Sequence, residues 1–221
     1  MKIIKHTFKK EKFSEDCALY ISKLINDLIK SKNFITIALS GGSTPLPILN
    51  QLVSFDIDWS KIKFFMVDER DVSLDSNESN YKNLNECFLT KIGASIYPMK
   101  NAITVEQSVD NYTKYLKKTF INKKPLFDII LLGMGTDGHI ASLFPDSNVL
   151  KEKTKWVTYT YIEKLESNRI TITYPIIENS KNIILIAKGR EKKQILENNK
   201  TNNLPIHELL KKSTVNWLYS D

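Results

Sequence analysis

The 221-residue sequence contains only two cysteines, Cys17 and Cys87, and no long apolar run. Two cysteines cannot staple a chain of this size, so we expect both to be reduced and buried. No window approaches the roughly 18 uninterrupted apolar residues that a membrane-spanning helix needs. Residues 1–6 lack the apolar stretch of a secretory signal. These absences predict a cytoplasmic protein that does not associate with membranes.

Several motifs of enzyme chemistry are also missing. Neither cysteine has a metal-ligand partner at zinc spacing, and no Gly-x-Ser-x-Gly nucleophile elbow occurs. The Gly-Lys-Ser/Thr ending of a Walker loop is absent as well. We therefore expect no metal site, no Ser-triad hydrolase and no bound cofactor.

The composition is that of an ordinary globular protein, with 42% hydrophobic and 26% charged residues and a net charge of +7. Residues 1–110 carry 14 basic and 14 acidic side chains, whereas residues 111–221 carry 18 and 11. A basic half can bind nucleic acid, an acidic membrane surface or an anionic small substrate. It can also be a lysine-rich solvated surface, and composition alone does not decide between these.

Apolar runs alternate with amphipathic segments along the whole chain, which predicts repeated βα units. The expected strands cover residues 34–39, 62–67, 127–132, 156–162, 169–174, 182–187 and 215–218. The expected helices are one capped by Ser14 and running to residue 29, then 45–53, 79–89, 104–120 and a short one after Gly189. No linker or repeat divides the chain. We predict a single α/β domain over residues 1–221, with three α/β/α layers and a mostly parallel, Rossmann-like sheet.

Polar clusters follow three of these strands at the point where each strand ends. They are Ser40–Pro45, Asp68-Glu69-Arg70 and Gly133–His139. In open parallel sheets, ligands bind beyond the carboxyl ends of the strands. The three clusters are therefore expected to converge on one crevice.

The first cluster has the features of an anion-binding loop. Gly41 and Gly42 let the backbone approach a ligand, and the free amides at the start of the following helix attract negative charge. Ser43 and Thr44 add hydroxyl donors, and Pro45 suits the first helical turn. The pattern favours phosphate binding, with a tight turn and helix cap as the alternative.

The third cluster matches Gly-x-Gly-x-x-Gly, a pattern typical of dinucleotide binding. A dinucleotide fold needs a long helix next, but Pro145 stops this one after about six residues. The glycines are better explained by a tight loop that presents Asp137 and His139. An unperturbed imidazole can accept a proton from water near neutral pH, so His139 is a candidate general base. The other two histidines, His6 and His207, lie among ordinary surface residues.

The second cluster, Asp68-Glu69-Arg70, is expected to bring both signs of charge to the crevice, and an ion pair at a strand end is the alternative. Arg169 could be a solvated residue at the edge of a strand. Lys192 could belong to a solvated helix face. For these two residues the sequence pattern alone favours the structural interpretation.

Taken together, the motifs resemble the 6-phosphogluconolactonases, which belong to a wider group with glucosamine-6-phosphate deaminases and ribose-5-phosphate isomerases. The matching stretches occur in the expected order over most of the chain. They are Ser40–Pro45, 67–70, 79–81, 132–145, 169–173 and 189–192. The resemblance implies an α/β/α sugar-phosphate hydrolase that converts 6-phospho-D-glucono-1,5-lactone to 6-phosphogluconate in the pentose phosphate pathway.

Two details favour the lactonase over the deaminase. A deaminase is expected to carry Asp-Glu-Tyr where this chain has Asp68-Glu69-Arg70. It would also carry an Asn-Glu-Pro-like ending where this chain has Ser142-Leu143-Phe144-Pro145. Ile140 departs mildly from the lactonase pattern, which commonly has Thr or another small residue there, and Asp146 stands where glycine is usual. The departure at Asp146 leaves the shape of the local loop open.

The resemblance also assigns roles. His139 would activate water, Asp137 would orient the imidazole or shape the loop, and Arg70 or backbone amides would stabilise the oxyanion. The candidate phosphate ligands are the amides of Gly41 and Gly42, the hydroxyls of Ser43 and Thr44, and the cations Arg169 and Lys192. The expected partner is a phosphorylated sugar lactone, not nucleic acid or membrane, with a possible functional link to glucose-6-phosphate dehydrogenase.

Three alternatives stay open. A deaminase or isomerase on the same fold would use a carboxylate such as Asp68 to move a proton between carbons. A sugar-phosphate sensor without activity would need no base, so His139 argues against it. A nucleic-acid-binding protein would draw on the basic half of the chain.

Overall fold

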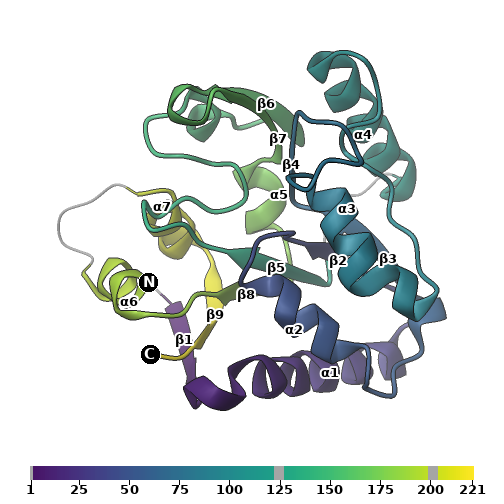
Figure 1. Cartoon of the computed structure of the whole chain (residues 1–221), viewed down its shortest axis with the longest axis vertical. Coiled ribbons are helices and arrows are strands. Elements are labelled where there is room, and N and C mark those ends of the chain that lie inside the picture. Colours follow the sequence, from purple (N-terminus) through teal and green to yellow (C-terminus); the bar gives the residue numbers. More distant parts are fainter. Residues whose placement is uncertain (1, 122–126, 199–203) are drawn as a thin grey trace.

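A computed structural model describes residues 2–121, 127–198 and 204–221 of the chain. Six parallel strands form the main sheet of the described part, in the order β1-β9-β8-β5-β2-β3 (Figure 1). They are β1 (Lys2–Thr7), β2 (Ile35–Leu39), β3 (Ile62–Met66), β5 (Ile129–Gly133), β8 (Asn182–Ile186) and β9 (Thr214–Tyr219). The predicted α/β fold with a mostly parallel sheet is confirmed.

Helices cover both faces of this sheet. The helices α1 (Phe13–Ser31) and α2 (Pro45–Leu52) lie side by side below it in Figure 1, and α5 (Tyr174–Glu178) and α7 (Pro205–Lys212) pack together above it. The strand β2, which lies between β5 and β3, is buried at all five positions. A strand covered on both faces has no polar side to alternate with, which explains the continuous apolar runs in the sequence. The remaining helices are α3 (Asn80–Leu84), α4 (Val105–Thr119) and α6 (Arg190–Glu197).

A second, antiparallel sheet was not predicted. It has the order β4-β7-β6, built from β4 (Asp68–Arg70), β7 (Ser167–Ile172) and β6 (Val157–Ile162). The strands β6 and β7 form a hairpin whose tip, Glu163–Leu165, is a single 3₁₀ turn. The sequence predicts both segments as strands. It does not predict their sheet, because β7 pairs with β4 through residues that are far apart in the sequence, such as Arg70 and Arg169. This small sheet lies above the carboxyl ends of the main strands in Figure 1.

Several local expectations are wrong. The edge strand β1 was not predicted, and α1 begins at Phe13 after Lys12, so Ser14 does not cap it. Cys17 is fully buried, but Cys87 is half-buried; both are free thiols. His207 is buried against the carbonyl of Ile195 instead of lying on the surface.

Within the described residues, α3 and α4 each begin with a side-chain cap. The hydroxyl of Ser79 accepts the amide of Lys82 at 3.2 Å at the start of α3. Thr104 accepts the amide of Gln107 at 3.2 Å at the start of α4. Beyond α3, one π-helical turn over Asn85–Leu89 continues the predicted helix to its expected end.

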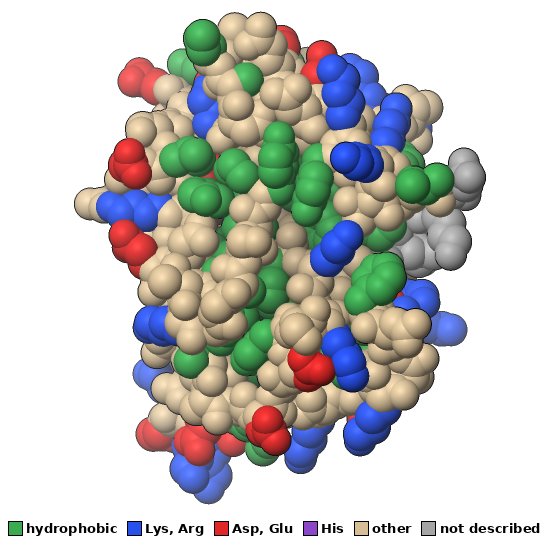
Figure 2. All heavy atoms as spheres, turned by 90° about the vertical axis from the view of Figure 1, so that its right-hand side faces the viewer, with side chains coloured by type: hydrophobic (Ala, Val, Ile, Leu, Met, Phe, Trp, Pro, Cys, Tyr) green, Lys and Arg blue, Asp and Glu red, His purple; other side chains and the backbone are tan. Residues whose placement is uncertain are grey.

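Basic side chains are spread over the face of the molecule that carries α3 and α4. Lys and Arg side chains there are scattered among acidic, polar and apolar groups, and they do not form one continuous patch (Figure 2). None of the helices in the described ranges is long and apolar enough to cross a membrane.

Tyr112 joins α4 to β3, the strand that leads into Asp68. Its hydroxyl accepts the amide of Met66 at 2.9 Å and lies 3.3 Å from the Met66 carbonyl, and its side chain is fully buried. Burial also raises the pKa of this phenol, so the hydroxyl stays neutral and can serve as donor and acceptor. A buried amide without a hydrogen-bond acceptor lowers the free energy of unfolding.

We predict that Tyr112→Phe lowers the free energy of unfolding by about 1–3 kcal/mol, because the Met66 amide loses its acceptor. Tyr115→Phe is the matched control, since Tyr115 lies on the same helix, is half-buried and stacks on Tyr97 at 4.5 Å. Urea denaturation of both variants measures the difference. Equal stabilities of the two variants would contradict the role of this hydrogen bond.

Candidate active site

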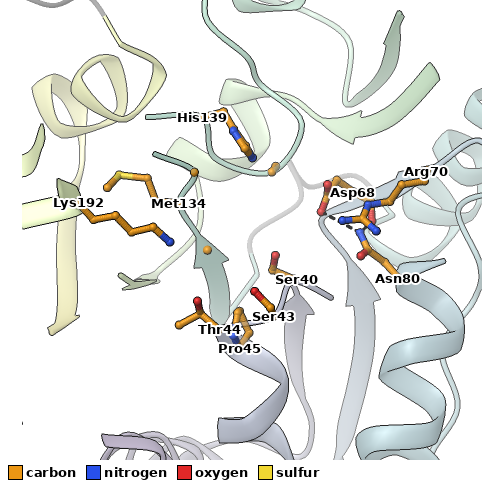
Figure 3. Close-up of a pocket in the computed structure, with 14 residues that line it drawn as sticks. Ser40, Ser43, Thr44, Pro45, Asp68, Arg70, Asn80, Met134, His139 and Lys192 are labelled. Carbon is orange, nitrogen blue, oxygen red and sulfur yellow. Dashed lines mark hydrogen bonds between the residues drawn. The ribbon is translucent and has the colours of Figure 1, made fainter. Parts of the chain in front are cut away.

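A pocket of about 270 Å³ opens where β2, β3, β5 and β8 end (Figure 3). The start of α2, the strand β4, the loop after β5 and the helix α6 contribute its walls. The lining residues are Ser40, Gly42, Ser43, Thr44, Pro45, Asp68, Arg70, Asn80, Gly133, Met134, Gly135, His139, Ala141 and Lys192. The three predicted clusters do converge, and the segment after β8 adds a fourth.

The loop between β2 and α2 supplies one wall. Pro45 occupies the first turn of α2, and Gly42, Ser43 and Thr44 line the pocket as predicted. Gly41 is not among the lining residues. A Cβ atom at Gly41 would lie 2.7 Å from the side chain of Asn80, so this glycine permits close packing between the loop and α3.

The loop after β5 presents His139 to the pocket. Nδ1 of His139 lies 2.5 Å from Oδ1 of Asp137, and the same oxygen accepts the His139 amide at 3.3 Å. Asp137 therefore both orients the imidazole and shapes the loop. Partial burial acts to raise the pKa of Asp137, but the contacts with Lys164 and His139 outweigh it and lower this pKa to about 2. The carboxylate thus stays ionised and can stabilise a protonated imidazole.

Gly135 is what allows this pair to form. A Cβ atom there would lie 2.3 Å from the imidazole of His139 and 2.6 Å from Oδ1 of Asp137. The backbone closes the loop through the Gly135 amide, which donates to the His139 carbonyl at 3.0 Å. The segment is a tight loop, with none of the short helix expected before Pro145.

The end of the loop covers the other side of the imidazole. The ring of Phe144 stacks on His139 with centroids 4.2 Å apart. Asp146 has a φ of 62°, in the left-handed region that glycine adopts most easily. Position 146 therefore has the left-handed conformation that explains why glycine is usual there, and aspartate tolerates this conformation.

Asp68 is buried, and neighbouring side chains hold both of its carboxylate oxygens. Ser142 donates to Oδ2 at 2.8 Å, and the side-chain amide of Asn80 lies 3.4 Å from Oδ1 and 3.0 Å from the Asp68 carbonyl. Neither Ser142 nor Asn80 was singled out for the site. Their bonds to Asp68 join segments 74 and 12 residues apart in the chain.

Glu69 does not line the pocket, unlike Asp68 and Arg70 of the same cluster, and sequence reasoning missed its role in the fold. It is fully buried, and its carboxylate accepts the amides of Arg70, Asn80 and Tyr81 and the hydroxyl of Ser79. The four donor distances are 2.7, 2.7, 2.8 and 3.1 Å, in that order. Burial raises the pKa of this carboxyl, although the backbone donors oppose the rise. Glu69 ties β4 to the start of α3.

Arg70 and Arg169 pair in register across β4 and β7 and line an adjoining pocket of about 350 Å³. This second pocket shares Asp68, Arg70, Gly135, His139 and Ala141 with the first. Among the described residues, Nη1 of Arg169 is buried without a hydrogen-bond partner. Burial and then the charge of Arg70 lower the pKa of Arg169. The neighbouring cations make this side of the crevice suited to an anion.

Lys192 approaches from the opposite wall, on α6 (Figure 3). Burial and then Lys188 lower the pKa of its ammonium. Arg169 lines only the second pocket and Lys192 only the first. The two predicted phosphate cations therefore occupy different parts of one crevice, with His139 lining both.

No three His, Cys, Asp or Glu side chains gather as a metal-ligand group within the described ranges. What the arrangement supplies is an oriented imidazole, a set of hydroxyl and amide donors, and cations on two walls. These groups suit proton transfer from water next to a bound anion.

The chain resembles known proteins over most of its length. A family model described as glucosamine-6-phosphate isomerases/6-phosphogluconolactonase matches residues 9–217. A probable 6-phosphogluconolactonase of Dictyostelium discoideum is 32% identical, over 97% of this chain and 96% of its own length. The chloroplastic 6-phosphogluconolactonase 3 of Arabidopsis thaliana is 36% identical, over 86% of this chain and 64% of that longer protein. The crystal structure of a 6-phosphogluconolactonase from Thermotoga maritima superposes over the whole of both chains, with a TM-score of 0.89 and 26% identity.

We predict that Glu69→Gln lowers the free energy of unfolding by about 2–4 kcal/mol, because one carboxylate oxygen is replaced by a donor that faces buried donors. Glu78→Gln, an exposed neighbour on the same segment, should change it by less than about 0.5 kcal/mol. Chemical denaturation of the two variants measures the contrast. A Glu69→Gln variant as stable as the control would remove Glu69 from this structural role.

Proposed function

The chain belongs to the glucosamine-6-phosphate isomerase/6-phosphogluconolactonase family, and we propose that it hydrolyses 6-phospho-D-glucono-1,5-lactone to 6-phosphogluconate. This reaction is a step of the pentose phosphate pathway. The observation that carries the proposal is the Asp137–His139 pair, whose imidazole faces a pocket lined by Arg70 and Lys192. The enzyme has a carboxylic ester, the lactone, as its substrate.

The lactone is an activated ester, so the reaction needs no covalent nucleophile. In the proposed mechanism, Nε2 of His139 takes a proton from water as the water oxygen bonds to C1. The negative charge then develops on the former carbonyl oxygen, next to positioned donors such as Arg70. The bond from C1 to the ring oxygen breaks, and the imidazolium returns its proton to that oxygen. Asp137 stabilises the imidazolium during this cycle.

The 6-phosphate supplies binding energy away from C1. We assign it to the crevice walls that carry Gly42, Ser43, Thr44 and Lys192, with Arg169 as a cation on the other side. Gly41 acts through packing against Asn80 and is not assigned a direct contact. Asp68, which was a candidate base, is assigned a positioning role, because Ser142 and Asn80 hold its oxygens.

A deaminase or isomerase on the same fold is the second candidate. In the segment where the deaminase pattern carries its Asn-Glu-Pro-like ending, this chain places Phe144, and its ring stacks on His139. An apolar ring here cannot exchange a proton with the imidazole. Arg70 likewise takes the place of the deaminase tyrosine. Both differences favour hydrolysis.

The other expectations remain proposals. We propose that residues 1–221 form one sugar-phosphate hydrolase domain, located in the cytoplasm and functionally linked to glucose-6-phosphate dehydrogenase. The chloroplastic name of one relative shows that proteins of this family also occur in a plastid.

We predict that His139→Ala lowers kcat for the freshly generated lactone by about 10²–10⁴-fold after correction for spontaneous hydrolysis, because the base is lost. Binding of 6-phosphogluconate and the circular dichroism spectrum should stay close to those of the wild type. Turnover near the wild-type rate would show that His139 is not the base. Release of ammonia from glucosamine 6-phosphate by the wild type would favour the deaminase.

We also predict that Lys192→Met raises KM for the phosphorylated lactone about tenfold with little change in kcat, because the ammonium contacts a group remote from C1. Lys193→Met is the matched control, since this neighbour on α6 does not line the pocket. Glucono-1,5-lactone without a phosphate tests the assignment directly. An equal rise in KM for both lactones would place Lys192 elsewhere than at the phosphate.

A further inference from the structure

Lys164 lies at the tip of the β6–β7 hairpin and reaches across to the loop that carries His139. Its Nζ lies 2.6 Å from Oδ2 of Asp137, while Oδ1 of the same carboxylate lies 2.5 Å from Nδ1 of His139. One carboxylate therefore joins the imidazole to a cation from the other sheet. The two contacts use different oxygens, so they can exist at the same time.

A second contact connects the same groups on the other side. The ammonium of Lys164 lies 5.3 Å from the centre of the Phe144 ring, and this ring stacks on His139. Lys164 thus touches both neighbours that fix the plane of the imidazole. The chain separation between Lys164 and Asp137 is 27 residues, so only the fold brings them together.

We propose that Lys164 is a positioning residue that holds the Asp137–His139 pair in its productive geometry and adds a positive charge beside it. The inference rests on the proposed function in that His139 is taken as the base. A free aspartate could rotate about its side-chain bonds and release the imidazole. Held through both oxygens, it keeps one orientation.

The electrostatic part of the role has a definite sign. The ammonium shares the negative charge of Asp137, so less of that charge remains to stabilise a protonated imidazole. The positive charge of Lys164 also repels an imidazolium directly. Loss of the Lys164 ammonium is therefore expected to stabilise the protonated form of His139 relative to the neutral form, which accepts a proton from water.

Other charged groups face the imidazole from the elements around it. They are Asp68 and Arg70 on β4, Arg169 on β7 and Lys192 on α6. Ser142 and Asn80 hold Asp68 in place, and the other three are cations whose effect has the same sign as that of Lys164. Removal of Lys164 leaves all four unchanged, so a shift on its removal reports this residue alone.

The Lys164–Asp137 ion pair is expected to contribute little to the stability of the fold. The Lys164 side chain is 58% exposed, and ion pairs between exposed groups add little to the free energy of folding. The variant Lys164→Met should therefore fold normally, which makes the residue suitable for a functional test.

The experiment is an NMR titration of the histidine side chains in the wild type, Lys164→Met and Lys164→Arg. The chain has only three histidines, so His6 and His207 serve as internal references. We expect the midpoint for His139 to rise by about 0.5–1 pH unit in Lys164→Met and to return toward the wild-type value in Lys164→Arg. His6 and His207 should not move. An unchanged His139 midpoint in Lys164→Met would overturn the proposal.

Kinetics provide the second readout. The acidic limb of the pH profile of kcat/KM should move to higher pH by the same number of pH units as the His139 midpoint. At pH 7, kcat should fall about two- to fivefold with KM nearly unchanged. The exposed Lys153→Met serves as the charge-matched control and should behave like the wild type. A large rise in KM without a shift in the His139 midpoint would make Lys164 a substrate ligand instead. A wild type without lactonase activity whose His139 midpoint still responds to Lys164→Met would refute the proposed function and retain the positioning role.

Discussion

The site depends on a single buried carboxylate that is not part of the pocket lining. Glu69 gathers three backbone amides and a hydroxyl, and these bonds fix the short strand β4 against the start of α3. Side chains alternate along a strand, so fixing Glu69 on one side directs Asp68 and Arg70 to the crevice on the other. Asn80, whose amide Glu69 accepts, in turn holds Asp68 and packs on Gly41. Two of the crevice walls are thereby set relative to each other by one ionisable group.

The parts of the site that could be predicted are those encoded by local sequence. A glycine-rich segment after an apolar run indicates a loop at the end of a strand, and parallel strands bring such ends to one edge. This reasoning located His139, Asp137, Ser43 and Arg70 correctly in one crevice. Glu69, Ser142 and Lys164 could not be found in this way. Their partners lie 12, 74 and 27 residues away in the chain, and an isolated Glu, Ser or Lys carries no local signal of such a contact.

The same limit explains the errors in the fold. Apolar runs predicted the buried parallel strands well, because burial on both faces leaves a continuous pattern. The strands β6 and β7 were predicted as elements, but a pattern does not state which strand a segment pairs with, so the antiparallel sheet was missed. The strand β1 is an exposed edge with lysines at both ends of its apolar pair, which hides it from a search for apolar runs. His207 is an error of the opposite kind, because a residue expected on the surface is buried. Burial is possible here because the carbonyl of Ile195 accepts a hydrogen bond from its ring.

The cations of the crevice are buried or half-buried, and burying a charged group costs free energy. Arg169 is buried beside Arg70, and within the described residues its Nη1 finds no acceptor. A buried guanidinium nitrogen without an acceptor lowers the stability of the fold even though Asp68 and Glu78 are near, and an anionic ligand would supply that acceptor. Lys192 repeats the pattern on the opposite wall, where burial disfavours its charged form. In the proposed mechanism, a substrate with a phosphate at one end and a developing oxyanion at the other meets a cation at each place. The net charge of +7 is a separate matter, because the proposed recognition uses three buried or half-buried cations and not the exposed lysines.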